Sequence, residues 1–91
     1  MIIVSQDKVA NINYNNIEAI YMLKKDDKIE INVRGNYDYK IGKYKTEERA
    51  KEVLQEIVKT YVLTEQYKVE DERTRIKLMM EGVLLYEMPK E

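Results

Sequence analysis

The stretch Lys28–Tyr61, KIEINVRGNYDYKIGKYKTEERAKEVLQEIVKTY, decides the fold because its hydrophobic period changes partway along it. Residues 28–34 alternate between polar and apolar side chains, which is typical of a strand with one buried face. Between residues 46 and 63 the apolar side chains recur at the spacing of an amphipathic helix. The stretch therefore predicts strand material followed by one long helix.

A hairpin is expected to join residues 28–34 to a second strand. Gly35 and Asn36 both tolerate a positive φ, which favours a two-residue hairpin turn. Residues 37–41 alternate again, and Gly42 is expected to end this second strand. In the first strand Ile29, Ile31 and Val33 are expected to face the core, whereas Lys28, Glu30, Asn32 and Arg34 are expected to face solvent.

The predicted helix, Thr46 to Leu63, has a recognisable start and one apolar stripe. Thr46 is the expected N-cap, and Glu47 lies in the first turn, where the helix dipole favours negative charge. Glu47 and Lys51 are spaced for an ion pair along the helix. The apolar stripe consists of Ala50, Val53, Leu54, Ile57, Val58 and Tyr61. This stripe is expected to pack on the sheet.

Further strands are predicted towards both ends of the chain. Residues 1–4 and 9–13 are expected to form a first hairpin, and residues 17–23 the next strand. Residues 83–88 predict a last strand that Pro89 stops. The two terminal strands are expected to pair or to lie as neighbours.

Two segments near the C-terminal end are less well defined. Residues 66–70 fit a short strand, and residues 71–81 fit a helical and a strand template equally well, so periodicity does not decide between them. With these segments left open, we expect a single domain over residues 1–91. Its fold class is α+β, an antiparallel meander of about five to six strands with one long amphipathic helix packed on it.

Composition excludes several classes of function. The 91 residues are 44% hydrophobic and 36% charged, which suits one folded domain rather than a disordered chain. A net charge of −1 makes nucleic acid an unexpected partner. No apolar run approaches the roughly 20 residues of a membrane span, and the first residues do not resemble a signal peptide. We therefore expect a cytoplasmic protein that does not contact membranes.

Catalysis and metal binding are not expected. The chain contains neither Cys nor His, and so lacks thiolate nucleophiles, the commonest general base and the usual zinc ligands. Ser5 has no histidine to activate it, and the adjacent Asp26 and Asp27 are interpreted as a polar turn. The sequence has neither a calcium-loop spacing nor a phosphate-binding glycine loop. We expect a protein that is not an enzyme and that holds no cofactor.

The predicted sheet carries more apolar surface than one helix covers. Five strands are roughly 24 Å wide, whereas a helix is about 10 Å across. Ile3 and several other apolar side chains are candidates for the face that the helix leaves open. Apolar patches often mark interfaces, so we expect a homo-oligomer. Its interface is expected to contain Ile20, Met22, Met79, Met80 and Leu85. The alternatives are a lid formed by residues 71–81 and an ordinary scatter of exposed hydrophobic residues.

Two groups of residues form the candidate ligand site. The first lies in the predicted hairpin and offers a cation, an amide and two aromatic faces, which can stack a base and pair a phosphate. Its members are Arg34, Asn36, Tyr37 and Tyr39. The second is a basic group on alternating positions, Arg73, Arg75 and Lys77. The alternative interpretation of both groups is a solvated charged surface.

Three blocks of the chain resemble small uncharacterised proteins of low-GC Gram-positive bacteria and their phages. The blocks are MIIVSQDK at residues 1–8, IGKYKTEERAKEVLQEI at residues 41–57 and YEMPKE at residues 86–91. Residues 64–82 match nothing in that group. The resemblance implies a small phage or prophage accessory protein. Among such proteins are compact oligomers that inhibit host defence, some by sequestering nucleotide-derived signals.

We therefore expect a non-enzymatic phage or prophage counter-defence protein that sequesters a small anionic, nucleotide-like ligand as a homo-oligomer. Such a site needs preorganised cations and aromatic faces but no general base, which suits a chain without His or Cys. Two alternatives stay open. One is a protein–protein inhibitor or adaptor that docks on a host protein. The other is a weak nucleic-acid-binding module, against which the net charge counts.

Overall fold

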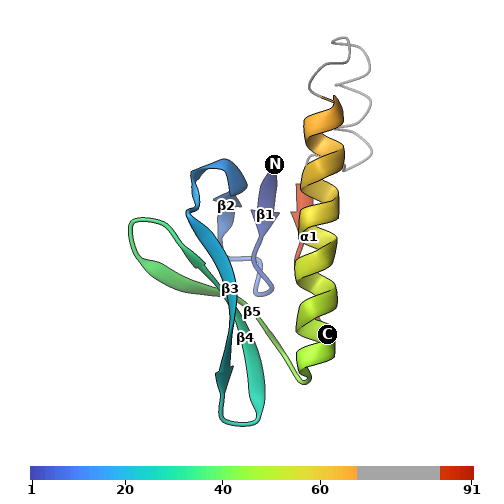
Figure 1. Cartoon of the computed structure of the whole chain (residues 1–91). Coiled ribbons are helices and arrows are strands. Elements are labelled where there is room, and N and C mark those ends of the chain that lie inside the picture. Colours follow the sequence, from blue (N-terminus) through green and yellow to red (C-terminus); the bar gives the residue numbers. More distant parts are fainter. Residues whose placement is uncertain (68–84) are drawn as a thin grey trace.

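The structure, a computed structural model, describes residues 1–67 and 85–91, and in this part of the chain six strands accompany one long helix (Figure 1). In chain order the elements are β1 (Ile2–Val4), β2 (Asn11–Asn13), the 3-10 turn η1 (Tyr14–Asn16), β3 (Ala19–Lys25), β4 (Lys28–Arg34), β5 (Asp38–Tyr44), α1 (Glu47–Tyr67) and β6 (Leu85–Glu87). The predicted α+β class, with about six strands and one long helix, is confirmed at this level.

The strands divide into two three-stranded sheets, with orders β2-β1-β6 and β3-β4-β5, where one meander is predicted. Only β3, β4 and β5 form an antiparallel meander. In the other sheet β1 pairs antiparallel with β2 and parallel with β6, so the terminal strands are neighbours as expected. A parallel pair needs a long connection between its two strands. For β1 and β6 this connection contains the other strands and α1.

The two hairpins of the β3-β4-β5 sheet differ in their turns. Lys25 pairs with Lys28, so the acidic pair between them forms the predicted polar turn, in which Asp26 has a φ of 53°. Arg34 pairs with Asp38, so the loop between β4 and β5 has three residues, not the two that are predicted. The wider loop turns Tyr37 outwards, with 75% of its surface exposed.

Strand β5 does not end at Gly42, which corrects that prediction. The pairing with β4 shifts by one residue at Ile41, and the strand then continues to Tyr44. A Cβ atom on Gly42 would lie 2.8 Å from Met88 Cε and 3.0 Å from a ring carbon of Tyr44. Gly42 is thus a point of close approach inside the strand, where no side chain fits without displacement of its neighbours.

One hydrophobic core is shared by the two sheets and the helix. Its buried members are Ile3, Ile12, Ile29, Ile31, Val33, Ile41, Tyr44, Ala50, Val53, Ile57 and Met88. The three inward residues predicted for β4 are among them. Glu30 and Asn32, predicted to face solvent, are also buried, with 8% and 6% of their surface exposed. The reason is that β4 is the central strand, so side chains of β3 and β5 flank it on both faces.

The helix begins as predicted. The Thr46 hydroxyl oxygen accepts a hydrogen bond from the backbone N–H of Arg49 at 3.1 Å, and Lys51 lies 3.5 Å from the Glu47 carboxylate. The buried face differs from the predicted stripe, because Val58 is 50% exposed and Thr64 is buried. The helix also runs on to Tyr67, so the start of the strand predicted at residues 66–70 is helical. Residues 68–84, including the undecided segment 71–81, lie outside the described part of the chain.

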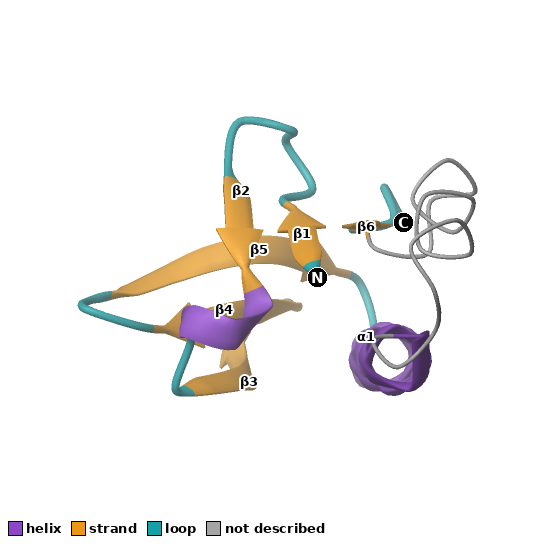
Figure 2. Cartoon of the chain, turned by 90° about the horizontal axis from the view of Figure 1, so that it is seen from above, coloured by secondary structure: helices purple, strands orange, loops and turns teal. Residues whose placement is uncertain are grey.

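Seen from above, α1 lies beside the strands rather than across them (Figure 2). Within the described residues, the structure contains no helix with both the length and the apolar character needed to cross a membrane.

Candidate anion-binding site

The predicted hairpin site is divided by the structure into two unlike parts. Arg34 Nε donates a hydrogen bond to Asp38 Oδ1 at 3.3 Å, and its guanidinium carbon lies 5.4 Å from the centre of the Tyr21 ring. Tyr21 in turn donates its hydroxyl proton to Asp38 Oδ2 at 2.9 Å. The bonds to Asp38 raise the pKa of Arg34 and the pKa of Tyr21. Arg34 therefore already has an anionic partner within its own chain.

The other three hairpin residues lie together without Arg34. Asn36, Tyr37 and Tyr39 line a separate hollow, which also receives residues of β2 and η1. The rings of Tyr37 and Tyr39 lie 6.5 Å apart at an angle of 57°. This part of the predicted site is polar and aromatic but carries no cation.

Most of the described residues that were predicted to lie on an open face of the sheet instead pack in or against the core. Ile20 pairs with Val33 and Met22 with Ile31, so both are on the core side of their sheet and pack against the core. Ile3, also expected on an open face, is fully buried between β2 and β6. Leu85 is 43% exposed at the start of β6. Met79 and Met80, and the basic residues Arg73, Arg75 and Lys77, lie outside the described residues.

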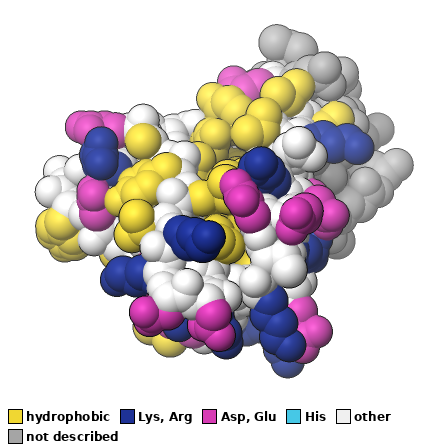
Figure 3. All heavy atoms as spheres, turned by 60° about the horizontal axis from the view of Figure 1, so that its bottom comes forward, with side chains coloured by type: hydrophobic (Ala, Val, Ile, Leu, Met, Phe, Trp, Pro, Cys, Tyr) yellow, Lys and Arg dark blue, Asp and Glu magenta, His cyan; other side chains and the backbone are white. Residues whose placement is uncertain are grey.

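A groove lined by lysines, which the sequence did not reveal, is larger than the hollow beside Tyr37 and has a volume of about 290 Å³. Three separate segments meet in it: the start of β4, the segment from the end of β5 to the start of α1, and the residues after β6. Its lining consists of Lys28, Lys43, Tyr44, Lys45, Arg49, Lys90 and Glu91. Figure 3 brings the lower end of the molecule in Figure 1 forward, and Lys and Arg side chains are spread over this face.

The side chain of Gln6 fixes the segments that carry two of these lysines. Its Nε2 donates to the backbone carbonyls of Lys43 at 3.1 Å, Pro89 at 3.1 Å and Lys90 at 2.8 Å. Its Oε1 accepts a hydrogen bond from the backbone N–H of Lys43 at 2.8 Å. One amide from the β1–β2 loop thus ties the end of β5 to the C-terminal segment, which gives the groove a defined backbone.

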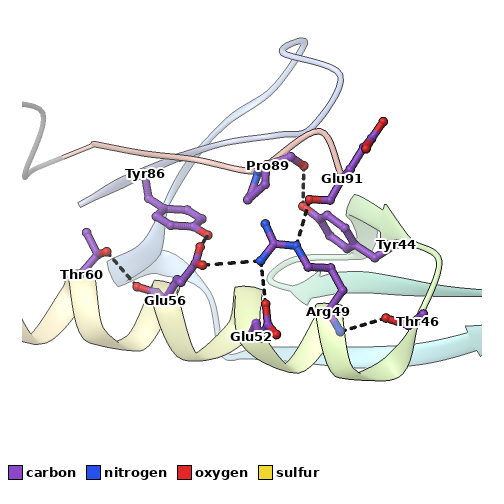
Figure 4. Close-up of polar contacts among 9 residues, drawn as sticks. All are labelled: Tyr44, Thr46, Arg49, Glu52, Glu56, Thr60, Tyr86, Pro89 and Glu91. Carbon is purple, nitrogen blue, oxygen red and sulfur yellow. Dashed lines mark hydrogen bonds and ion pairs between the residues drawn. The ribbon is translucent and has the colours of Figure 1, made fainter.

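Arg49 is held by a polar network between α1 and the C-terminal segment (Figure 4). Its guanidinium lies 3.0 Å from Glu52 and 3.6 Å from Glu56, and its Nε donates to the Glu91 carbonyl at 2.9 Å. The hydrogen bond to Glu52 raises the pKa of Arg49. Arg49 therefore contributes to the shape of the groove more than to its charge, because two carboxylates already neutralise it.

Two tyrosines complete that network. Tyr44 donates its hydroxyl proton to the Pro89 carbonyl at 2.8 Å, and Tyr86 donates to Glu56 Oε2 at 2.7 Å. Burial raises the pKa of Tyr44 to about 12. Burial, followed by the hydrogen bond to Glu56, also raises the pKa of Tyr86. Both phenols thus stay protonated donors at neutral pH and hold the C-terminal segment against β5 and α1.

The lysines of the groove differ from Arg49 in having no acidic partner. Within residues 1–67 and 85–91, the ion pairs of at most 4.0 Å involve none of the four lysines of the groove, Lys28, Lys43, Lys45 and Lys90. Four lysine charges from three segments therefore line one hollow, and they outnumber the one carboxylate side chain in its lining, that of Glu91. Such an arrangement attracts a multiply charged anion.

Other site chemistry has less support in the described residues. In that part of the chain, no three acidic side chains are grouped so that they could hold a metal ion. Comparisons with protein-family models, with curated proteins and with solved structures gave no match for this chain. The resemblance to small Gram-positive and phage proteins therefore stays a prediction.

Proposed function

We propose that this chain is a non-enzymatic binding protein that holds a small, multiply charged anion in the lysine groove. The observation that carries the proposal is the convergence of four unpaired lysines on one hollow of about 290 Å³. The ligand expected from the sequence is thus retained, but its site moves from the Arg34 hairpin to the other end of the same sheet.

The chemistry of the groove favours phosphate groups. Lysine ammonium groups are compact point charges on flexible stems, which suit clustered phosphate oxygens better than the planar geometry of a single carboxylate. The volume lies at the lower end of the roughly 300–1,000 Å³ that is typical of small-molecule sites. We infer a ligand of the size of inorganic tripolyphosphate or a nucleoside diphosphate.

The biological role that we propose is sequestration, as the resemblance to phage and prophage proteins implies. Sequestration requires binding without turnover, and a groove of lysines supports binding while supplying no histidine base and no thiolate. The small volume of the groove favours this role over the binding of long nucleic acids, because the groove accommodates only a few phosphate groups.

Isothermal titration calorimetry of the full chain with sodium tripolyphosphate and with ADP tests the proposal. Replacement of Lys43 or Lys45 by Ala is expected to raise Kd by about tenfold or more, since a hydrogen bond to a charged group contributes about 1.5–3 kcal/mol. The matched control is Lys59→Ala, which removes an exposed lysine from α1, outside the groove. Absence of heat with both ligands, or an equal loss in the control variant, would overturn the proposal.

Self-association is a separate proposal. Of the predicted interface residues that the structure describes, Leu85 is exposed, whereas Ile20 and Met22 pack against the core. Light scattering measures the mass directly. A multiple of the 10.9 kDa chain mass supports a homo-oligomer, and the single-chain mass at high concentration contradicts it.

A further inference from the structure

A second hollow of about 230 Å³ lies at the opposite end of the β3-β4-β5 sheet from the lysine groove. It is formed where β2 and η1 approach the loop between β4 and β5. Its polar and aromatic lining consists of Asn11, Asn13, Asn16, Asn36, Tyr37 and Tyr39. Ile12 and Ile17 supply an apolar floor, and Ile12 is part of the buried core.

The lining of this hollow carries no charge at neutral pH. All nine of its residues are Asn, Tyr, Ile or Gly, in a chain of which 36% is charged. The nearest cation in sequence, Arg34, is paired with Asp38 and does not line the hollow. An anionic or cationic ligand would therefore find no counter-charge here, and desolvating its charge would oppose binding. The hollow suits a neutral ligand.

The amides of the hollow can donate and accept several hydrogen bonds. Asn13 is fixed in place, because its Oδ1 accepts a hydrogen bond from the backbone N–H of Asn15 at 3.0 Å, while its Nδ2 remains a donor. The side chains of Asn11, Asn16 and Asn36 form no hydrogen bond with other described residues. Each such amide offers two donors and an acceptor to a bound molecule. Their ligand is expected to be rich in hydroxyl or amide groups.

The two tyrosines offer apolar faces beside these amides. Tyr37 is 75% exposed and Tyr39 36% exposed, and their rings are inclined at 57° rather than parallel. A flat base is best held between parallel rings, and nucleotide binding would also require cations for the phosphate. A sugar ring has C–H groups on its faces and hydroxyl groups around its edge. It can therefore pack against one inclined ring while its hydroxyl groups bond to the amides.

We propose that this hollow is a binding site for a neutral saccharide, distinct from the lysine groove. The exposed ring of Tyr37 packs against a face of the sugar, and the amides of Asn11, Asn16 and Asn36 bind its hydroxyl groups. The proposal is independent of the anion site, because strand β4 separates the two hollows by about 20 Å.

Nuclear magnetic resonance titration of the ¹⁵N-labelled chain tests the saccharide site. The probes are cellobiose, maltose and N,N′-diacetylchitobiose, with adenosine as the comparison ligand. At least one disaccharide is expected to shift the side-chain amide signals of Asn36 and Asn16 in a saturable way. Shifts that are caused by adenosine alone, or no saturable shift with any of the disaccharides, would overturn the proposal.

Two variants locate the site. Tyr37→Ala, at an exposed position where folding is not expected to suffer, should weaken disaccharide binding by about tenfold, the effect of losing one well-packed aromatic contact. The matched control is Asn15→Ala, which removes an exposed amide that does not line the hollow and should leave Kd unchanged. Lys45→Ala should also leave saccharide binding unchanged. Equal effects of Tyr37→Ala and Asn15→Ala would contradict the assignment.

Discussion

The two ends of the β4–β5 pair present opposite chemistry on a shared scaffold. At the end that begins with Lys28, the end of β5, the β5–α1 connection and the C-terminal segment add three further lysines that form no ion pair within the described residues. At the end that carries Tyr37, β2 and η1 add three asparagines. The strands supply part of the difference, because Lys28 and Lys43 lie on β4 and β5 at one end and Tyr39 lies on β5 at the other. The remainder arises from the segments that the rest of the chain brings to each end.

The basic residues at the two ends also differ in whether they form ion pairs. The two arginines in the described residues, Arg34 and Arg49, are both bonded to acidic side chains of the same chain. The lysines of the groove are not. A basic residue therefore indicates an anion site only when the fold leaves it without an acidic partner, which the sequence alone does not reveal.

The largest effect on the lysine end is expected from Gln6→Ala. This substitution removes the hydrogen bonds that join Lys43 to the C-terminal segment, so the free energy of unfolding should fall by about 2–3 kcal/mol. Urea denaturation measures the loss, and Gln55→Ala on the exposed face of α1 is the control. Tripolyphosphate binding should weaken while disaccharide binding is unchanged. Unaltered stability and unaltered anion affinity together would contradict the role assigned to Gln6.

A pair of glycine substitutions compares the two ends directly. Gly42→Ala places a Cβ atom 2.8 Å from Met88 Cε, so the neighbours must shift, and the variant should lose about 1–2 kcal/mol of stability. At the other end, a Cβ atom on Gly35 has its nearest contact at 4.0 Å, and Gly35→Ala should change stability by less than about 0.5 kcal/mol. Thermal unfolding of both variants provides the measurement, and equal effects would show that Gly42 is not a point of close packing.

Alkaline pH should loosen the lysine end through Tyr44. The folded chain holds the pKa of Tyr44 at about 12, above the ordinary value of 10.0, so the folded state binds this proton more tightly than the unfolded state. The resulting stability is fully present below pH 10 and is lost as the pH rises towards 12. Urea midpoints between pH 8 and about 12 measure this loss. Tyr44→Phe should show a shallower decline, and an identical decline in both proteins would contradict the prediction.

The smallest effect is expected from Arg34→Ala. Its ion pair with Asp38 is about half-exposed, and solvent screens exposed pairs so that they contribute little to stability. Stability should change little, and neither tripolyphosphate nor disaccharide binding should weaken. A marked loss of tripolyphosphate binding, measured by calorimetry, would instead support the hairpin site that the sequence predicts.

The sequence predicted those features that depend on local pattern. The strand at residues 28–34 and the N-cap at Thr46 are confirmed, because both depend on residues that are close in sequence. The predicted outward face of that strand is wrong for Glu30 and Asn32, which are buried. The division into two sheets was not predictable, since β6 reaches β1 only through the fold. The candidate site was not predictable either, because it also depends on tertiary contacts. Nothing in the local sequence distinguishes Lys43 or Lys90 from other surface lysines. Ion pairing and the bonds of Gln6 single them out, and both are tertiary.

The parallel pairing of β1 with β6 also has a consequence for synthesis of the chain. Ile3 pairs with Tyr86, which is translated much later than Ile3 because β2 to β5 and α1 lie between the two residues in the chain. Until then one edge of β1 has no partner, and an open strand edge can template pairing with a neighbouring polypeptide. Rapid overexpression is therefore expected to favour aggregation of the nascent protein, and slower translation at low temperature should improve the yield of folded material.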